Sequence, residues 1–369
     1  MSGSRADIVL VGGGHAHVAV LADWAQRGVP ARRATLLTPH PFLRYSGMLP
    51  GWIAGEHSRD AGTVDLRALA RAAGVELVLD RCVAIDPQTR SLLTLENGVV
   101  PFEHASIDVG GVGRSAKALG DDSRLIDIRP IHRFVAELEQ GDRASSRIAV
   151  IGGGAGGVEL AFALRNREGH RSPPPLVLIA GEQGLLPGFS SAVRRKVRVE
   201  LGRQGIRLLE VDGWLERGVL MAGEEEIAAD QIVAALGSMA PDWPRAGGLA
   251  VDEGGFIAVD PFQRSTSHPH IFAAGDCARR VDRTVPHSGL HAVHTGPVLA
   301  ANLRAALLGG KPRRSYWPRP ASLYLLSTGQ GEAIASYGSL TAQGRWVSRL
   351  KAWIDKRWIA SYAKLSEGA

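Results

Sequence analysis

The chain has 369 residues, of which 45% are hydrophobic, and a formal net charge of +6. This length predicts two or three domains, and the mild, dispersed charge does not indicate nucleic-acid binding. No apolar run is long enough to predict a membrane-spanning helix, and the N-terminus lacks the pattern of a signal peptide. Cys82 and Cys277 lie far apart without a CxxC spacing, so we expect a reducing, cytoplasmic compartment and no redox-active dithiol.

Strand and helix patterns alternate along the chain, and their order repeats. The first series is a strand at 7–12, a helix at 16–27 ending at Gly28, a strand at 34–38, a loop at 39–55, a helix at 65–73, a strand at 75–79, a hairpin around Asn97-Gly98 and a strand at 105–109. The second is a helix at 130–140 ending at Gly141, a strand at 147–151, a helix at 157–167, a strand at 176–180, a helix at 191–203 and strands at 206–211 and 231–236. A helix at 286–307, a connector at 311–320, a strand pair and a terminal helix complete the chain. The repetition predicts two related α/β domains.

A glycine-rich turn joins strand to helix in the second series. Gly152, Gly154 and Gly157 have the GxGxxG spacing of a dinucleotide site. The first glycine permits the tight turn, the second lets the backbone approach a diphosphate, and the third lets helix and strand pack closely. The N-terminus of the following helix attracts the phosphates. This motif predicts a bound dinucleotide.

A similar turn occurs at the start of the chain. Gly12 and Gly14 fit the pattern, but His17 takes the position of the third glycine. Its side chain must therefore point away or change the packing of the helix. The strands after the two turns end at Thr38 and Ala180, where an acidic residue normally binds a ribose diol, so the choice between NADH and NADPH stays open.

A third motif, Thr266 to Asp276, is similar to the second FAD fingerprint of two-dinucleotide flavoproteins. In that fingerprint a short strand delivers a Gly-Asp pair to the cofactor, and the aspartate accepts a hydrogen bond from a ribityl hydroxyl. Together with the two turns, it indicates electron transfer between a flavin and a nicotinamide.

With these motifs the chain resembles the pyridine nucleotide-disulfide oxidoreductase superfamily over essentially its whole length. The nearer likeness is to type II NADH dehydrogenases and sulfide:quinone reductases, and to a flavoprotein group of which some members are fused to selenophosphate synthetase; residues 12–17 and 45–51 are similar to the signatures of that group. The resemblance implies an α/β fold with two Rossmann-like dinucleotide-binding domains and a C-terminal segment. The implied divisions are an FAD domain at 1–112 and 240–315, an NAD(P)H domain at 113–239 and an interface segment at 316–369.

The resemblance also implies the site residues. Those expected at FAD are Gly12, Gly14, His15, Ala16, Thr38, Pro39, Tyr45, Ser46, Gly47, Met48, Leu49, Pro50, Val83, Gly110, Gly275 and Asp276. Those expected at NAD(P)H are Gly152, Gly154, Gly157, Ala180 and Gly237. Glu159 matches a glutamate that type II dehydrogenases place near nicotinamide and flavin, so it is a candidate catalytic residue.

The expected acceptor pocket departs from the type II dehydrogenases. Their quinone-contacting glutamines are replaced by Leu290 and His294, which weakens the quinone assignment. His287, His291 and His294 share one helical face. They are candidates for a proton relay, with His294 as a possible catalytic residue, or for structural histidines; a metal site is not expected because no further ligand completes one.

The C-terminal helix carries a stripe of Trp346, Leu350, Trp353, Ile354 and Trp358 with basic residues beside it. Such a helix binds a membrane surface peripherally, or it docks on the protein's own core or on a second copy in a homodimer. The sequence leaves these readings open.

These features predict an FAD-dependent NAD(P)H oxidoreductase that passes electrons to a small-molecule acceptor, with a quinone favoured. The alternatives are a soluble flavin reductase that serves a protein or selenium-metabolism partner, and a low-turnover flavin-based redox sensor.

Overall fold

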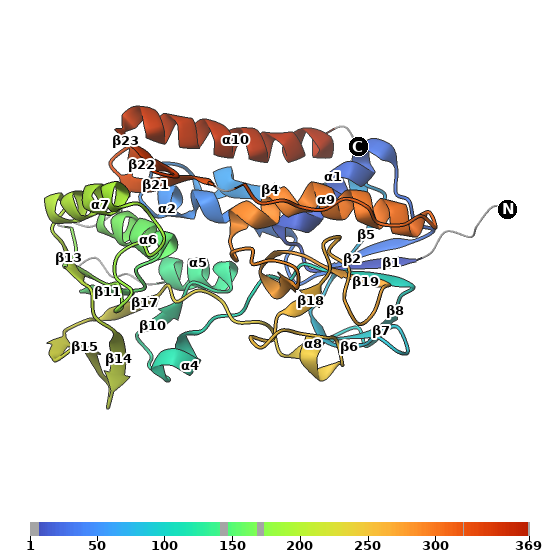
Figure 1. Ribbon diagram of the computed structural model, residues 1–369, viewed down its shortest axis with the longest axis horizontal. Coiled ribbons are helices and arrows are strands. Elements are labelled where there is room, and N and C mark those ends of the chain that lie inside the picture. Colours follow the sequence, from blue (N-terminus) through green and yellow to red (C-terminus); the bar gives the residue numbers. More distant parts are fainter. Residues whose placement is uncertain (1–6, 141–146, 168–172, 320, 368–369) are drawn as a thin grey trace.

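The computed structural model describes residues 7–140, 147–167, 173–319 and 321–367, and the predicted helix end at Gly141 lies outside them. Two five-stranded parallel sheets organise the chain (Figure 1). The first has the order β19-β9-β1-β2-β5, with bounds Ile271–Ala273, His104–Ile107, Ile8–Val11, Ala34–Thr38 and Glu76–Leu79. The second has the order β10-β17-β11-β12-β13, with bounds Leu125–Asp127, Gln231–Ala234, Ile148–Ile151, Leu176–Ile179 and Ile206–Leu209.

The described helices are α1 (His15–Arg27), α2 (Leu49–Ile53), α3 (Leu66–Ala72), α4 (Ser115–Leu119), α5 (Ile131–Gln140), α6 (Ala155–Arg165), α7 (Ser191–Arg203), α8 (Trp243–Ala246), α9 (Gly289–Leu307) and α10 (Arg345–Glu367). Single 3-10 turns are η1 (Ser46–Met48), η2 (Arg59–Gly62) and η3 (Gly275–Cys277). Short strands form smaller sheets: β3 (Phe42–Arg44) with β4 (Thr63–Asp65), β6 (Cys82–Asp86) with β7 (Ser91–Thr94) and β8 (Val99–Pro101), β14 (Gly213–Glu216) with β15 (Val219–Ala222) and β16 (Glu225–Ile227), β18 (Ile257–Val259) with β20 (Ala278–Arg280), and β21 (Leu323–Gly329) with β22 (Glu332–Tyr337) and β23 (Leu340–Gly344).

Each parallel sheet is the middle of three layers, because its strands are buried on both faces. Alternate residues of β1 face opposite layers: Ile8 and Leu10 pack with α1, α3 and α9, whereas Val9 and Val11 pack with β6–β8 and β18. In the second sheet one face packs on α5, α6 and α7 and the other on β14–β16. The predicted repetition is thus present as two similar three-layer units, which lie side by side in Figure 1.

The edge strand β19 comes from late in the sequence, so the first unit is discontinuous. Segments of both predicted FAD-domain parts, 1–112 and 240–315, contribute strands to its sheet. The boundaries themselves remain a prediction.

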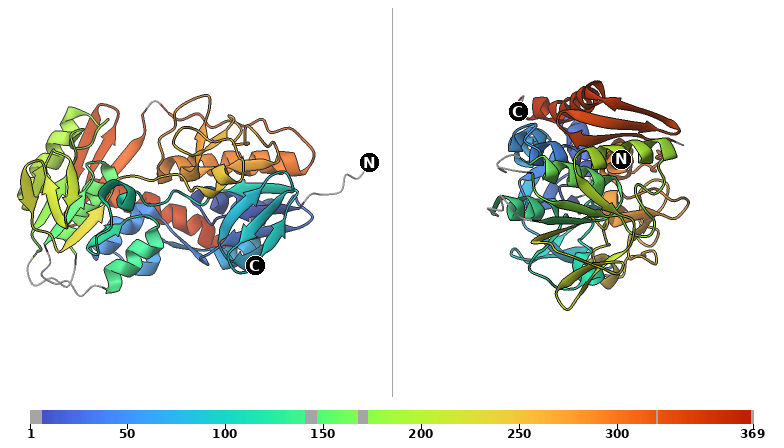
Figure 2. Two further views of the ribbon diagram at one scale, coloured as in Figure 1. Left: turned by 90° about the horizontal axis from the view of Figure 1, so that it is seen from below. Right: turned by 90° about the vertical axis from the view of Figure 1, so that its left-hand side faces the viewer.

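The C-terminal segment connects the two units. β21–β23 pack against α6 and α7 of the second unit, and α10 then runs back over α1 and α3 of the first (Figures 1 and 2). The sequence predicted a strand pair here, and the structure has a three-stranded antiparallel sheet. No described helix is both long and apolar enough to cross a membrane.

The stripe on α10 divides into two parts. Trp358, with Ile359, Tyr362 and Leu365, packs against the core of the first unit. Trp346 and Trp353 point outward and are 57% and 58% exposed. Docking on the protein's own core therefore accounts for Trp358 but not for the two exposed tryptophans.

The segment 39–55 is more ordered than the predicted loop, because β3, η1 and α2 lie within it. Pro50 stands in the first turn of α2, where its missing N–H has no helical partner to lose. The glycines and prolines of this segment thus predicted its turns correctly but gave no indication of its short helices.

Candidate active site

The first glycine-rich turn carries the chain from β1 into α1. Gly12 has φ +95°, which favours glycine, and a Cβ there would collide with the backbone of Asp108. Gly14 is the N-cap of α1 and has extended backbone. The strand–turn–helix geometry of a dinucleotide site is therefore present at the first turn.

His17 fits the third glycine position because it is fully buried and hydrogen-bonded. Its Nδ1 lies 2.6 Å from the carbonyl oxygen of Gly12 and its Nε2 lies 2.8 Å from the hydroxyl oxygen of Ser106. Since the carbonyl can only accept, Nδ1 donates and Nε2 accepts from the serine. Burial lowers the pKa of His17 to about 4, so the ring is neutral. The side chain thus ties the turn to β9.

A carboxylate that the sequence analysis missed lies at the start of α1. Asp108, at the end of β9, is 3% exposed, and its Oδ2 accepts the backbone N–H groups of Ala16 at 2.8 Å and of His17 at 3.0 Å. Burial raises the pKa of Asp108 to about 7, and the nearby Asp276 adds to the rise, although the two amides oppose it. Its position near the end of a predicted buried strand could have indicated a site residue from the sequence alone.

The second turn has the same geometry without such a carboxylate. Gly152 has φ +131°, and a Cβ on Gly157 would collide with the carbonyl oxygen of Gly152, so both positions require glycine. A Cβ on Gly154, the N-cap of α6, would meet nothing within 4 Å. In the described chain no side chain accepts from the first-turn amides of α6, which leaves them available to a diphosphate.

Asp276, the aspartate of the third motif, bridges the two units. It lies in η3 at 6% exposure, and its Oδ2 accepts from Nη2 of Arg129 at 2.8 Å. Its Oδ1 is buried and has no partner in the described chain. A free buried acceptor needs a donor, so this atom fits the ribityl hydroxyl that the motif implies. Arg129, which precedes α5, was not predicted.

The 45–50 segment lies beside α1 and α10. The ring of Tyr45 stacks on Trp358 with centroids 4.5 Å apart, and His15 lies 5.7 Å from Tyr45. Burial, together with the charge of Arg129, lowers the pKa of His15 to about 4. Lys351 of α10 donates to the carbonyl oxygen of Gly47 at 2.6 Å. The C-terminal helix is thus part of the site.

Lys351 also forms an ion pair with Asp355, one helical turn later, at 3.0 Å. Asp355 is buried, and after burial itself this carboxylate is the main reason that the pKa of Tyr45 is raised. From the sequence we predicted a tryptophan stripe with basic residues beside it, and no role for Lys351 or Asp355. An i, i+4 lysine–aspartate pair within that stripe was the signal for a buried polar function.

Glu159, the candidate catalytic residue, lies on α6 close to this cluster. Its Oε1 accepts the backbone N–H of Ser327 in β21 at 2.9 Å. Burial raises the pKa of Glu159, while the ammonium of Lys351 and the Ser327 amide act against that rise. Glu159, Lys351 and Asp355 therefore form one electrostatic group at the junction of the two units.

The other predicted cofactor positions lie at the ends of strands β2 and β12, in η1, α2 and β6, and at the crossovers between the units. Thr38, Met48 and Pro50 are buried, Pro39 is exposed, and Val83 is 37% exposed. Gly110 and Gly237, at the crossovers between the units, have φ +69° and +80°, and Ala180 is buried at the end of β12. Their roles toward FAD and NAD(P)H remain predictions.

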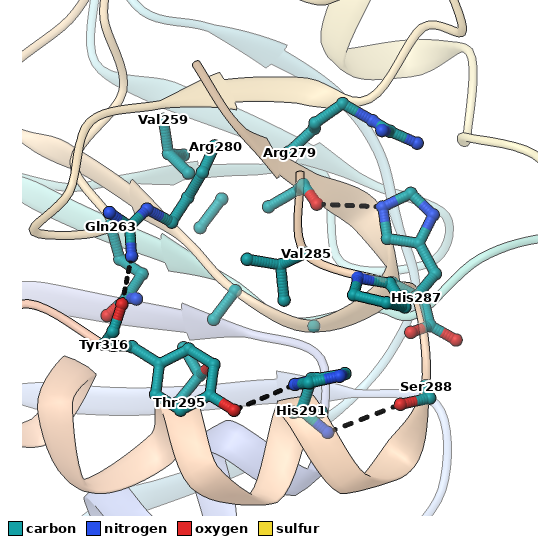
Figure 3. A pocket seen from close by; sticks show the side chains of 17 residues that line it. Val259, Gln263, Arg279, Arg280, Val285, His287, Ser288, His291, Thr295 and Tyr316 are labelled. Atoms are coloured by element: carbon teal, nitrogen blue, oxygen red, sulfur yellow. Dashed lines mark hydrogen bonds between the residues drawn. The ribbon is translucent and has the colours of Figure 1, made fainter. Parts of the chain in front are cut away.

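The three histidines at α9 do not converge on one point. Asp276 is among the residues that line a small cavity of about 40 Å³. His287 and His291 also line this cavity (Figure 3). His291 Nδ1 lies 2.8 Å from the hydroxyl of Tyr316, His287 Nε2 lies 3.1 Å from the carbonyl oxygen of Ala278, and His294 is exposed. Neither Leu290 nor His294 lines this cavity, and no described contact joins His294 to Glu159. In the described chain no group of histidine, cysteine or acidic residues is arranged to hold a metal.

Both cysteines are buried, and neither forms a disulfide. Burial raises the pKa of Cys82 and of Cys277 to about 12, so neither thiol ionises readily. The geometry offers no support for dithiol chemistry.

Comparison with known proteins agrees with this arrangement. Residues 6–296 match the family described as pyridine nucleotide-disulphide oxidoreductase. The chain is 25% identical over 293 residues to ferroptosis suppressor protein 1 of Taeniopygia guttata (75% of this chain, 74% of the relative), and 23% identical over 290 residues to the NADH dehydrogenase-like protein YutJ of Bacillus subtilis strain 168 (76% and 78%). The sulfide:quinone oxidoreductase of Aquifex aeolicus has the same fold, with a TM-score of 0.76 at 18% identity over 97% of this chain and 92% of that one. The predicted two-dinucleotide fold is thereby confirmed.

Proposed function

Because the chain belongs to the pyridine nucleotide-disulphide oxidoreductase family, it is an FAD-dependent NAD(P)H oxidoreductase, and we propose that its electron acceptor is a quinone. Bound FAD would supply the chemistry of hydride acceptance from the nicotinamide and of two-electron transfer to the acceptor. The overall reaction consumes NAD(P)H, one proton and the quinone, and it yields NAD(P)⁺ and the quinol. Beside FAD, the chain must therefore bind two substrates and deliver one proton.

The observation that carries this proposal is the cluster of Glu159, Lys351 and Asp355 beside the 45–50 segment. Quinone reduction places negative charge on a carbonyl oxygen before protonation, and a fixed ammonium stabilises that charge. Lys351 is fixed by Gly47 and Asp355. Glu159, whose pKa is raised by burial, holds a proton more readily than an exposed carboxyl does. The fold similarity to a sulfide:quinone oxidoreductase supports the same acceptor class.

Replacement of Lys351 by methionine tests the assignment. We expect K351M to lower kcat/KM for a short-chain quinone by about 100-fold, the effect of losing one charge-stabilising donor. The rate of flavin bleaching by NAD(P)H and the turnover with ferricyanide, which accepts electrons without a proton, should stay close to those of the unmodified protein. The matched control is K356M, an exposed lysine on the same helix.

Equal losses with quinone and ferricyanide would show that Lys351 has no role specific to the quinone. A protein that reduces ferricyanide but no quinone would favour the soluble flavin reductase. A protein whose flavin neither NADH nor NADPH bleaches would favour the redox sensor.

The exposed face of α10 supports a peripheral membrane contact for the same function. Trp346 and Trp353 lie seven residues apart on this face, with Arg345, Arg349 and Arg357 exposed beside them. Tryptophan with basic residues is typical of helices that lie at a membrane surface, where apolar quinones dissolve. The same helix brings Lys351 to the site, which would couple membrane contact to quinone access.

Vesicle flotation tests this contact. We expect binding to vesicles that contain anionic lipid, and loss of binding in W346S/W353S. The control is W214S, an exposed tryptophan on β14 in the small sheet away from α10. Unchanged flotation of W346S/W353S would contradict the proposal, and a dimer that dissociates in this variant would assign the face to a second copy of the chain.

A further inference from the structure

The two glycine-rich turns differ in what occupies the helix N-terminus. In α1 the amides of Ala16 and His17 both donate to one oxygen of Asp108, at 2.8 and 3.0 Å. In a dinucleotide site these first-turn amides face the diphosphate. The carboxylate therefore takes donors that the cofactor needs.

Asp108 lies between the two motifs that are expected to hold FAD. A Cβ on Gly14 or on Gly275 would collide with its carboxylate, so the group touches the backbone of both the first turn and the Gly-Asp motif. This position is nearly closed to solvent, since Asp108 is 3% exposed. A diphosphate at α1 would thus lie against this carboxylate with little water between them.

The charges around Asp108 leave it without a cationic partner in the described chain. From η3 it faces Asp276, whose charge is already paired with Arg129, and the thiol of Cys277, whose raised pKa keeps it neutral. From α1 it meets the backbone amides of Ala16 and His17. The rings of His15 and His17 add no positive charge, because pKa values of about 4 keep both neutral above pH 6. Two anions, the carboxylate and the diphosphate, would then share one helix N-terminus.

We propose that Asp108 takes up a proton when FAD binds, so that the affinity of this protein for its cofactor depends on pH. The binding equilibrium joins apoprotein, FAD and one proton, and the proton resides on the carboxyl of Asp108. The protonated carboxyl no longer repels the diphosphate, and it can donate its O–H to a phosphate oxygen.

The sign of the pH dependence follows from linkage. Burial already raises the pKa of Asp108 to about 7 in the cofactor-free chain, and the diphosphate raises it further. Below pH 7 the carboxyl is protonated in both states and the affinity is constant. Above pH 7 the bound state holds one more proton than the free state, so the affinity falls about tenfold per pH unit.

Equilibrium dialysis of the holoprotein tests the proposal. The protein is dialysed between pH 6 and 9, and free and bound FAD are measured by flavin fluorescence. We expect a constant dissociation constant below pH 7 and a rise of about tenfold per unit above it. D108N, which keeps the hydrogen-bond acceptor without the charge, should bind FAD equally well at all these pH values and about 30-fold more tightly than the unmodified protein at pH 8.5.

The matched control is D65N. Asp65 caps α3 with the same geometry, accepting from Arg67 and Ala68 at 2.9 and 3.0 Å, but it is exposed. Its replacement should leave the pH dependence of FAD affinity unchanged. A constant affinity of the unmodified protein from pH 7 to 9 would overturn the proposal even if D108N did not fold, and so would a D108N protein with an undiminished slope. Either result leaves the quinone assignment untouched.

Discussion

The first and second glycine-rich turns have the same strand–turn–helix geometry, but they differ in whether a side chain accepts from the first-turn amides of the helix. At the second turn glycine occupies all three fingerprint positions, and no described side chain accepts from the first-turn amides of α6. At the first turn His17 replaces the third glycine and Asp108 accepts from α1. An open helix end suits a nucleotide that binds and leaves in every catalytic cycle, whereas at the first turn a diphosphate has to share the helix end with Asp108, so we expect FAD retention there to depend on pH.

Gly157→Val should give the largest effect of the changes that test this comparison. Its Cβ would collide with the carbonyl oxygen of Gly152, so the helix and strand must separate. We expect a loss of about 3 kcal/mol in the free energy of unfolding, measured by denaturant titration, and loss of NAD(P)H binding. Gly156→Ala is the control, because its Cβ would meet nothing within 4 Å. Similar losses in both variants would contradict the close-packing argument.

His17→Ala should have the next largest effect, since it deletes a buried ring and two hydrogen bonds. We expect about 2–3 kcal/mol less stability and weaker FAD retention, followed by denaturation and flavin release. Ser106→Ala removes only the partner of Nε2 and should cost about 1 kcal/mol. If His17→Ala changed neither stability nor FAD retention, the hydrogen bonds of His17 would have no stabilising role at this turn.

Alanine at the two N-cap glycines should lower stability at the first turn and weaken NAD(P)H binding at the second. In Gly14→Ala the new Cβ displaces Asp108, and we expect about 1–2 kcal/mol of lost stability. In Gly154→Ala the Cβ enters open space, so stability should stay within about 0.5 kcal/mol while KM for NAD(P)H rises. Thermal unfolding and steady-state kinetics measure the two effects. A loss of stability in Gly154→Ala but not in Gly14→Ala would contradict the claim that the first turn is closely packed at its N-cap and the second is open.

Protonation of His17 should have the smallest effect on stability near neutral pH, and it grows only toward acid. His17 has a pKa of about 4 in the folded chain, below its unfolded value, so it binds a proton less readily when folded. The contribution of His17 to stability should therefore be constant above pH 6.5 and fall toward pH 4 by about 1.4 kcal/mol per pH unit. His17→Ala should remove that contribution, and chemical denaturation from pH 4 to 7 measures it. An unchanged slope would mean that His17 is not the group that titrates.

The sequence predicted the repeated parts of the fold well. Buried strands such as 34–38 and helices such as 191–203 have strong periodicity and clear ends, because strand burial and helix caps act locally. The Gly152–Gly157 motif was equally easy to predict, because local steric constraints require its glycines. The short helix at 49–53 was not predicted, because its proline and glycine are also typical of a loop.

The polar part of the site was harder to predict because it depends on contacts between distant segments. Lys351 meets Gly47, Asp108 meets Ala16, and Arg129 meets Asp276 only in the folded chain. Sequence spacing cannot bring these pairs together. The stripe on α10 shows the same limit, because its periodicity was correct but only the structure separates the core-facing Trp358 from the exposed Trp346.

Anaerobic stopped-flow absorbance is the most direct test of the central claim, that a nucleotide bound at the second turn reduces a flavin held at the first. The purified protein is mixed with NADH or NADPH, and the reduced protein is then mixed with a short-chain quinone. The account predicts a yellow protein that one nucleotide bleaches rapidly and that the quinone restores. A yellow protein that binds nucleotide at the second turn but keeps its flavin oxidised would contradict it.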